Sequence, residues 1–332
     1  MTRLLTTGFE TGDNSDFYIY SPSTPSIITS PVRTGSYAVS STGLTYGRFK
    51  QFTGTDVLYG HTGIRFPYGG YGIPLEGIQF LDSSGTVLIT ICQDSPGYRI
   101  SAYLGNKSSL LAKSTSDFAI NTWYGMEFYI YIADSGGRAV IKMDGAIWID
   151  YTGDTKVSTT TDIAYMQLCS NSGVFQYYDD IVLNDDSGSD NNTYPGQVKL
   201  LPFRPDGAGD NTGLTPSTGS NYQCVDEVPA SATDYVYDTV IDDYDLYTTA
   251  NPTIPDGATI TNVIVIAHSA YDSGGGSIAP IMKSGSIIAS GIDFALSSAY
   301  RPYEYCRSKD PNGDIEWTVS GINSLQIGEK VR

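Results

Sequence analysis

The chain has 332 residues, 40% of them hydrophobic, and a formal net charge of −17. Its length predicts two domains, and its hydrophobic content excludes a disordered chain. Acidic residues outnumber basic ones in both halves, which excludes a nucleic-acid-binding protein, because phosphate contacts require Lys and Arg. No segment reaches the roughly 18 consecutive apolar residues of a membrane helix, so no membrane partner is expected.

The composition favours β-strands joined by tight turns. Asp outnumbers Glu by 29 to 7, and Asp favours turns whereas Glu favours helices. The chain also contains 36 Gly and 16 Pro, which are common in turns. An all-β fold is therefore expected.

Short alternating segments recur about every 8–12 residues in the first half, as is typical of an antiparallel sandwich. A short opening strand ends near Glu10. Asp144 and Gly145 predict a hairpin, because Asp-Gly between alternating strands favours a tight turn. The other predicted strands cover residues 86–92, 127–133, 138–143, 146–151, 162–169 and 175–183.

The first predicted domain spans residues 1–185, an antiparallel jelly-roll sandwich. Residues 186–196 are polar and rich in turn formers, which predicts a linker. Residues 197–332 are predicted to form a second, smaller β-sandwich, with strands at 197–203 and 259–267. Short helical turns are predicted at residues 225–232 and 238–249.

Several segments of the first half resemble the concanavalin-A/laminin-G-like jelly-roll group. These sandwiches share a Trp that enters a strand, a partner strand that ends in Asp-Gly, and a closing strand with Asp-Asp-Ile. The matching segments are residues 121–127 (NTWYGME), 140–145 (VIKMDG), 153–155 (GDT) and 179–181 (DDI). The resemblance covers about residues 1–185 and implies a fold rather than a function, because the group contains lectin-like modules, glycosidases, adhesins and virion proteins.

The region around the predicted linker resembles structural proteins of tailed bacteriophages, in which such a jelly roll is joined to a second small β domain. The matching segments are residues 178–185 (YDDIVLND), 194–196 (YPG), 204–209 (RPDGAG) and 221–229 (NYQCVDEVP). The resemblance implies a non-enzymatic component of the virion, associated with the tail, a fibre or the capsid surface. Its implied partners are other virion proteins and further copies of itself. The alternative is a carbohydrate-binding, lectin-like module for host or extracellular glycans.

Glu10, Asp179 and Asp180 are the candidate metal ligands. The first and last strands of a sandwich often lie side by side, so these acids could meet, and calcium prefers carboxylate and carbonyl oxygens. In jelly rolls that resemble this chain, a structural Ca²⁺ ties the opening strand to the closing strand. Only one of Asp179 and Asp180 is expected to face Glu10, because adjacent strand residues point to opposite faces. The alternative is that these acids are solvated or hydrogen-bond a loop.

Enzymatic motifs are sparse, and no catalytic or cofactor-binding residue is predicted. The two histidines, His61 and His268, fall in different predicted domains, and no GxSxG motif supplies a nucleophile. His61 is expected in a loop. The four cysteines form no CxxC pair, so buried free thiols are expected rather than a zinc site.

Exposed tyrosines are the remaining functional signal. Tyr59, Tyr68 and Tyr71 lie in or near Gly- and Pro-rich segments. Tyrosine rings can anchor protein interfaces or stack on sugar rings, and they also serve as ordinary packing residues. The loop at residues 67–74 is the preferred interface candidate.

Overall fold

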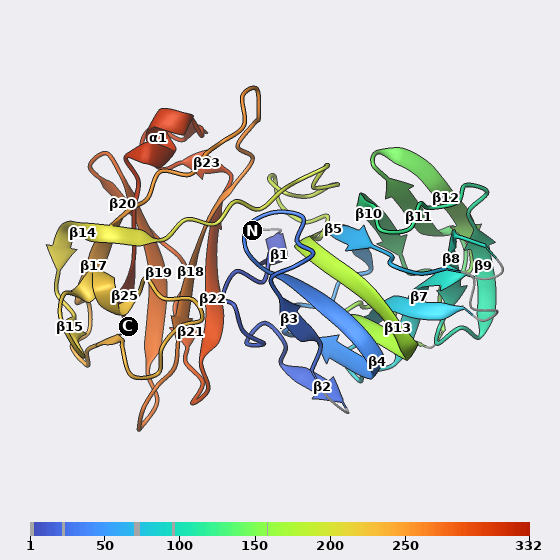
Figure 1. Ribbon diagram of the computed structural model, residues 1–332, viewed down its shortest axis with the longest axis horizontal. Helices are drawn as coiled ribbons and strands as arrows, with labels where there is room; N and C mark the ends of the chain where they lie inside the picture. Colours follow the sequence, from blue (N-terminus) through green and yellow to red (C-terminus); the bar gives the residue numbers. More distant parts are fainter. Residues whose placement is uncertain (1–2, 22–23, 70–73, 95–96, 158) are drawn as a thin grey trace. The chain divides into compact units, whose positions relative to one another are not determined.

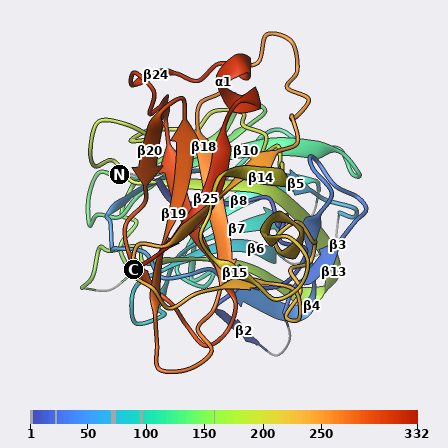
Figure 2. The same cartoon turned by 90° about the vertical axis from the view of Figure 1, so that its left-hand side faces the viewer.

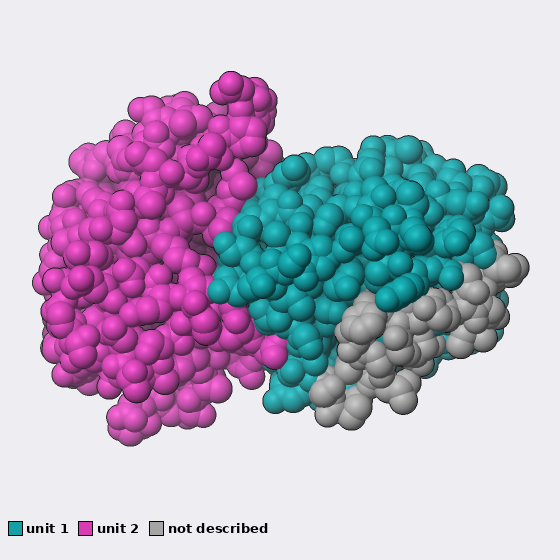
Figure 3. All heavy atoms as spheres, viewed as in Figure 1, with its two compact units in different colours: residues 1–10, 16–200 teal, residues 11–15, 201–332 magenta. Residues whose placement is uncertain are grey.

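The computed structural model describes residues 3–21, 24–69, 74–94, 97–157 and 159–332. The chain divides into two compact units, which Figure 3 colours separately. The first contains residues 1–10 and 16–200, and the second contains residues 11–15 and 201–332. The segment 186–196, predicted as a linker, belongs to the first unit.

The described residues of the first unit form thirteen strands, and the expected antiparallel jelly roll is confirmed. The strands are β1 (Arg3–Thr7), β2 (Ile19–Ser21), β3 (Ser26–Ile28), β4 (Ala38–Arg48), β5 (Val57–Arg65), β6 (Leu75–Leu81), β7 (Val87–Asp94), β8 (Arg99–Leu104), β9 (Ser109–Lys113), β10 (Trp123–Tyr131), β11 (Gly137–Met143), β12 (Ala146–Gly153) and β13 (Tyr165–Asn184). Both hairpins predicted around β11 are present.

Two long strands, β4 and β13, run side by side and link the two sheets of the sandwich (Figure 1). The second half of β13 has β5 on one side and β1 on the other. From β5 the sheet continues through β10 and β11 to β12, and we call this the first sheet. The first half of β13 pairs with β6, which continues to β7, β8 and β9; we call this the second sheet. The expected contact of opening and closing strands is confirmed, since Thr7 pairs with Ile181.

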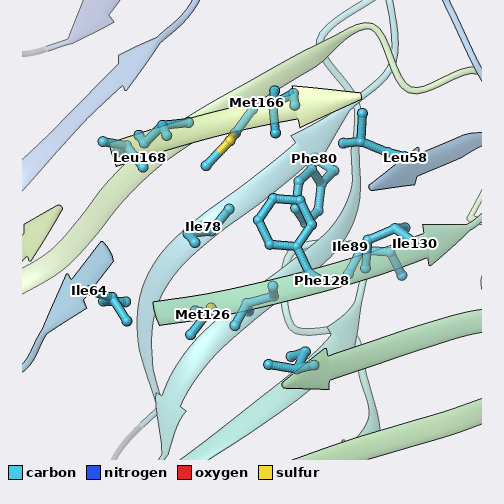
Figure 4. Packing of buried hydrophobic residues seen from close by; sticks show 14 of the residues in the cluster. Leu58, Ile64, Ile78, Phe80, Ile89, Met126, Phe128, Ile130, Met166 and Leu168 are labelled. Carbon is cyan, nitrogen blue, oxygen red and sulfur yellow. The ribbon is translucent and has the colours of Figure 1, made fainter. Parts of the chain in front are cut away.

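The core lies between these two sheets. Phe80 of the second sheet meets Phe128 of the first, with ring centroids 5.0 Å apart (Figure 4). Ile78, Met166 and Leu168 are also fully buried around them. Burying a side chain of this size contributes about 1.5–3 kcal/mol, so this cluster supplies much of the stability of the unit.

The second unit is a smaller two-layer β structure, as expected. Its larger sheet has the order β14–β17–β25–β19–β20. Figure 2 shows β19 and β20 of this sheet side by side. β18 pairs with β22 in a separate two-stranded sheet. The elements are β14 (Pro205–Thr212), β15 (Thr215–Pro216), the 3₁₀ helix η1 (Asn221–Cys224), β16 (Val236–Tyr237), β17 (Tyr244–Thr249), β18 (Val263–Ser269), β19 (Ser277–Ser284), β20 (Ile287–Ser290), β21 (Phe294–Ala295), β22 (Arg301–Arg307), β23 (Lys309–Asp310), β24 (Ile315–Glu316), α1 (Val319–Asn323) and β25 (Gln326–Val331). Val263, Met282 and Tyr305 pack between the two layers. The helical turns predicted at residues 225–232 and 238–249 are wrong, because the first segment is irregular and β17 is a strand inside the larger sheet. The strand predicted at residues 197–203 is also wrong, because that segment is irregular and the next strand begins at Pro205.

Two acids share one hydroxyl group inside this second unit. The hydroxyl of Tyr247 lies 2.8 Å from Asp245 Oδ2 and 2.9 Å from Glu329 Oε1. The phenol hydroxyl has one proton and can donate to only one of the two acids. The other acid must therefore be protonated and donate its own proton to the phenol oxygen. Burial raises the pKa of Glu329 to about 8, so Glu329 holds that proton at neutral pH.

No helix within the described residues is long and apolar enough to cross a membrane.

Candidate functional site

The outward-facing side of the second sheet carries a continuous set of polar side chains. Ile78, Phe80, Ile89, Ile91 and Leu168 point into the core. Because strand residues alternate between faces, the residues next to these point to the other side of the sheet. The polar residues on that side are Gln79, Thr90, Ser101, Tyr103 and Gln167, and strand pairing brings them side by side. We call this side the polar face.

A directed chain of hydrogen bonds crosses the polar face. Arg48 Nε donates to Gln167 Oε1 at 3.1 Å, and Gln167 Nε2 donates to Gln79 Oε1 at 2.9 Å. Gln79 Nε2 then donates to Asn106 Oδ1 at 3.3 Å. Gln79 and Gln167 are only 4% and 5% exposed, so the two amides form a buried polar floor. A satisfied network of this kind is rigid, since each amide orientation is fixed by its neighbours.

Arg48 stands at the head of this chain between two tyrosine rings. Its guanidinium carbon lies 6.0 Å from the ring centre of Tyr46 and 5.0 Å from that of Tyr165. Tyr46 lies two residues before Arg48 on β4. On β13, which runs antiparallel to β4, Tyr165 lies two residues before Gln167, the residue paired with Arg48. The two rings therefore lie on opposite sides of Arg48 along the strand direction. All three side chains are half-buried.

A glycine leaves room for the guanidinium. Gly85 has a φ of +87°, and a Cβ atom built on it would lie 3.3 Å from Arg48 Nη1. The positive φ is one that residues other than glycine adopt rarely. The turn at residues 82–86 thus brings a backbone without a side chain against Arg48.

Two ion pairs lie at the other end of the polar face. Lys107 Nζ is 2.7 Å from Glu76 Oε1, and Lys113 Nζ is 3.1 Å from Asp94 Oδ2. The hydroxyl of Tyr103 lies 3.5 Å from the same Asp94 oxygen. Burial and the charge of Asp94 raise the pKa of Tyr103 to about 12, so its hydroxyl is a stable hydrogen-bond donor at neutral pH.

The cysteines are buried, as expected, and none of the four is in a disulfide. Cys92 and Cys169 lie beneath the charged end of the polar face. Burial raises the pKa of both thiols above the ordinary value, which keeps them in the unreactive thiol form. They are packing residues rather than nucleophiles.

The predicted metal ligands instead hold one loop of the first unit. The backbone N–H groups of Arg33 and Thr34 donate to Asp179 Oδ2 at 2.8 and 3.2 Å. Arg33 Nη1 lies 2.6 Å from Asp180 Oδ2, and the hydroxyl of Thr34 donates to Asp180 Oδ1. Glu10 Oε1 accepts hydrogen bonds from the N–H groups of Ser36 and Tyr37, at 2.9 and 3.1 Å.

The expectation that Asp179 and Asp180 face opposite ways is wrong. The pairing of β13 with β5 shifts register between Asp179 and Val182, and Asp180 has a φ of +49°. This bulge turns both carboxylates into the interior, where both residues are 0% exposed.

The donors around these acids do not match a calcium site. Calcium needs six to eight oxygen ligands, whereas the oxygens named above accept from N–H groups, a hydroxyl and a guanidinium. Within the described residues, no group of three His, Cys, Asp or Glu side chains is arranged to hold a metal ion. Structural calcium stays a prediction from the sequence resemblance.

The three predicted tyrosines have different environments. Tyr59 is half-buried and stacks on Tyr129 with ring centroids 4.8 Å apart, and Tyr194 meets it edge-on at 5.2 Å. Tyr68 is 49% exposed. Tyr71 lies outside the described residues.

His61 is not in a loop as predicted, because it lies on β5 with no exposed surface. Its Nδ1 is 2.9 Å from the backbone oxygen of Asp180. Burial lowers the pKa of His61 to about 4, so the ring is neutral and supports the bulge.

The sequence did not single out the polar face. Its five defining residues come from the consecutive strands β6, β7 and β8 and from the distant strand β13. The local signal was polar alternation, such as Tyr165 and Gln167 beside apolar neighbours. Alternation predicts which side chains of a strand share a face, but it does not predict which strands lie next to each other. Identifying this cluster therefore required the order of the strands in the sheet.

No protein-family model matches the chain, and no curated protein matches it in sequence. Several solved structures are similar to it. The cellulose-induced protein Cip1 has 13% identity and a TM-score of 0.45, covering 58% of this chain and 99% of that one. The endo-β-1,4-glucuronan lyase from the fungus Trichoderma reesei has 11% identity and a TM-score of 0.44, covering 55% and 95%. The carbohydrate-binding module CBM66 from Bacillus subtilis has 11% identity and a TM-score of 0.36, covering 51% and 98%. Similarities this distant carry no argument about function.

Proposed function

We propose that the first unit binds carbohydrate on the polar face of its second sheet. The observation that carries this proposal is the buried amide floor of Gln79 and Gln167 beside the half-buried rings of Tyr46 and Tyr165. A sugar presents hydroxyl groups and apolar C–H faces together. The buried amides orient Arg48 and Asn106, which reach the surface and can exchange hydrogen bonds with the hydroxyls, while the tyrosine rings can cover the C–H faces.

The charged end of the polar face suits the same ligand. Lys107, Lys113 and the Tyr103 hydroxyl add donors, and Glu76 and Asp94 add acceptors. Each acid is already paired with a lysine, so the end presents polar groups with little net charge. Small-molecule sites commonly combine a few fixed polar groups with aromatic walls.

The test measures binding to a panel of oligosaccharides by isothermal titration calorimetry, with the wild-type chain and Tyr165→Ala. The variant should weaken binding about tenfold or more, because it removes one ring beside the amide floor. Tyr177→Ala is the matched control, since Tyr177 lies under Arg65 at 5.5 Å in a similar contact on the first sheet. The absence of binding to any sugar, or equal loss in both variants, would contradict the proposal.

The binding role is proposed to be non-enzymatic. Incubation of each bound oligosaccharide with the protein should leave its chain length unchanged by mass spectrometry. Appearance of shorter products would instead assign a cleaving enzyme. The location in a phage particle, with virion proteins and further copies of the chain as partners, is a proposal supported by the sequence resemblance alone.

A further inference from the structure

Among the residues that the structure describes, Arg48 has no acidic partner, unlike the other cations of the polar face named above. Lys107 and Lys113 are each in an ion pair with a carboxylate. Among the described residues, the Arg48 side chain donates through Nε to Gln167, contacts the two tyrosine rings and lies beside the backbone of Gly85. Its Nη1 and Nη2 therefore keep their hydrogen-bond donors available.

The guanidinium is also held in one orientation. The bond from Nε to Gln167 fixes one edge of the group, and Gln167 is fixed in turn by Gln79. The rings of Tyr46 and Tyr165 restrict its motion along the strand direction. A fixed guanidinium loses less conformational entropy on binding than a free arginine, which favours affinity for an anion.

The geometry of an arginine fork is selective. Two parallel N–H groups match the two oxygens of a carboxylate, and such bidentate contacts are stronger than bonds between neutral groups. Glu76 and Asp94 lie at the other end of the polar face and are each paired with a lysine, so they do not cancel the charge of Arg48. The ligand group that best complements this end of the polar face is thus a carboxylate.

Resting on the glycan-binding function proposed above, we infer that the sugar bound on the polar face carries a carboxylate group, as uronic acids do. Arg48 is the specificity-determining residue, and it receives that carboxylate through Nη1 and Nη2. Gln167 is a positioning residue, because it acts by orienting Arg48.

The test compares uronic-acid tetrasaccharides of galacturonate, glucuronate, mannuronate and guluronate with their carboxyl-reduced, neutral counterparts. Calorimetric titration of the full chain should give about tenfold or tighter binding for at least one charged member over its reduced form. Arg48→Gln should abolish this difference, and Arg48→Lys should restore it only in part, because lysine lacks the planar fork. Arg65→Gln is the control, since it removes the same charge and a similar ring contact from the first sheet.

The outcomes separate the two proposals. Equal binding of charged and reduced sugars would overturn the carboxylate inference and leave glycan binding in place. Binding of a sulfated galactan tetrasaccharide without binding of any uronate would also overturn it. Failure of every sugar to bind would overturn both proposals. An equal loss in Arg48→Gln and Arg65→Gln would show a general charge effect and remove Arg48 from its role.

Discussion

Asp180→Asn should strongly destabilise the first unit. Asp180 has no exposed surface, and the side chain of its partner Arg33 is only 10% exposed. The substitution removes the negative charge and leaves the guanidinium buried beside a neutral amide. Asn is chosen because, like Asp, it tolerates the positive φ of this position, so the backbone of the bulge is not strained further.

The expected cost follows from the burial of the pair. Removing one partner of a buried ion pair costs about 3–5 kcal/mol, because the remaining charge is not compensated. For a unit of this size, each kcal/mol lowers the melting temperature by about 2–4 °C, so a decrease of roughly 6–20 °C is expected. The backbone bond from Leu200 to Asp180 Oδ1, at 2.8 Å, would lose its charged acceptor and add to the effect.

Differential scanning calorimetry of the full chain measures this decrease, with Asp117→Asn as the control. Asp117 pairs with Arg99 at 3.0 Å, but the two side chains are 56% and 42% exposed. A pair this exposed contributes about 0–1 kcal/mol, so the control should melt within about 4 °C of the wild type. Equal melting of Asp180→Asn and the control would refute the reasoning that the buried pair holds the loop. A double variant with Arg33→Met should recover part of the loss, since it also removes the uncompensated charge.

Two further outcomes are expected. Adding calcium or a chelator should leave the melting temperature of the first unit unchanged, because its three candidate acids already accept from N–H and guanidinium donors. A rise of several degrees with calcium would contradict this expectation. The second unit should lose stability as the pH rises from about 4.5 to about 8. In that range the folded state keeps a proton on Glu329, whereas the unfolded state releases it. The loss in the free energy of unfolding is at most about 5 kcal/mol. Melting curves measured across this range should show the loss, and Glu329→Gln should flatten it.

Features set by local sequence were predictable in this chain. The hairpin at Asp144 and Gly145 follows from two residues whose backbones tolerate a positive φ, here +48° and +82°. The pairing of the first and last strands also followed from a general property of sandwiches, and the register places Leu5 opposite Leu183. The first prediction depended on neighbouring residues, and the second on the fold class that the composition and strand spacing indicate.

Other features depended on contacts that the sequence does not express locally. The alternation rule separated Asp179 from Asp180, but a bulge with a left-handed residue brought both to the loop at Arg33. Residues 238–249 were predicted as helical turns, yet β17 is a strand because it has β14 and β25 as neighbours. Tertiary pairing overrides a weak local preference in both cases.

The contrast between the two outward faces of the first unit supports the location of the proposed site. On the first sheet, Tyr194 packs against the ring of Tyr59, Lys142 lies 3.5 Å from the Tyr194 ring centre, and Gln197 Nε2 donates to Glu127 at 2.9 Å. The segment that follows β13 thus supplies partners for that face from within the same unit. On the second sheet, the described residues satisfy the amide floor but leave the donors of Arg48 available. Within the described residues, the Nη1 and Nη2 donors of Arg48 have no partner, and the floor beside them is rigid. This arrangement suits an external partner and favours the second sheet over the first for the proposed ligand.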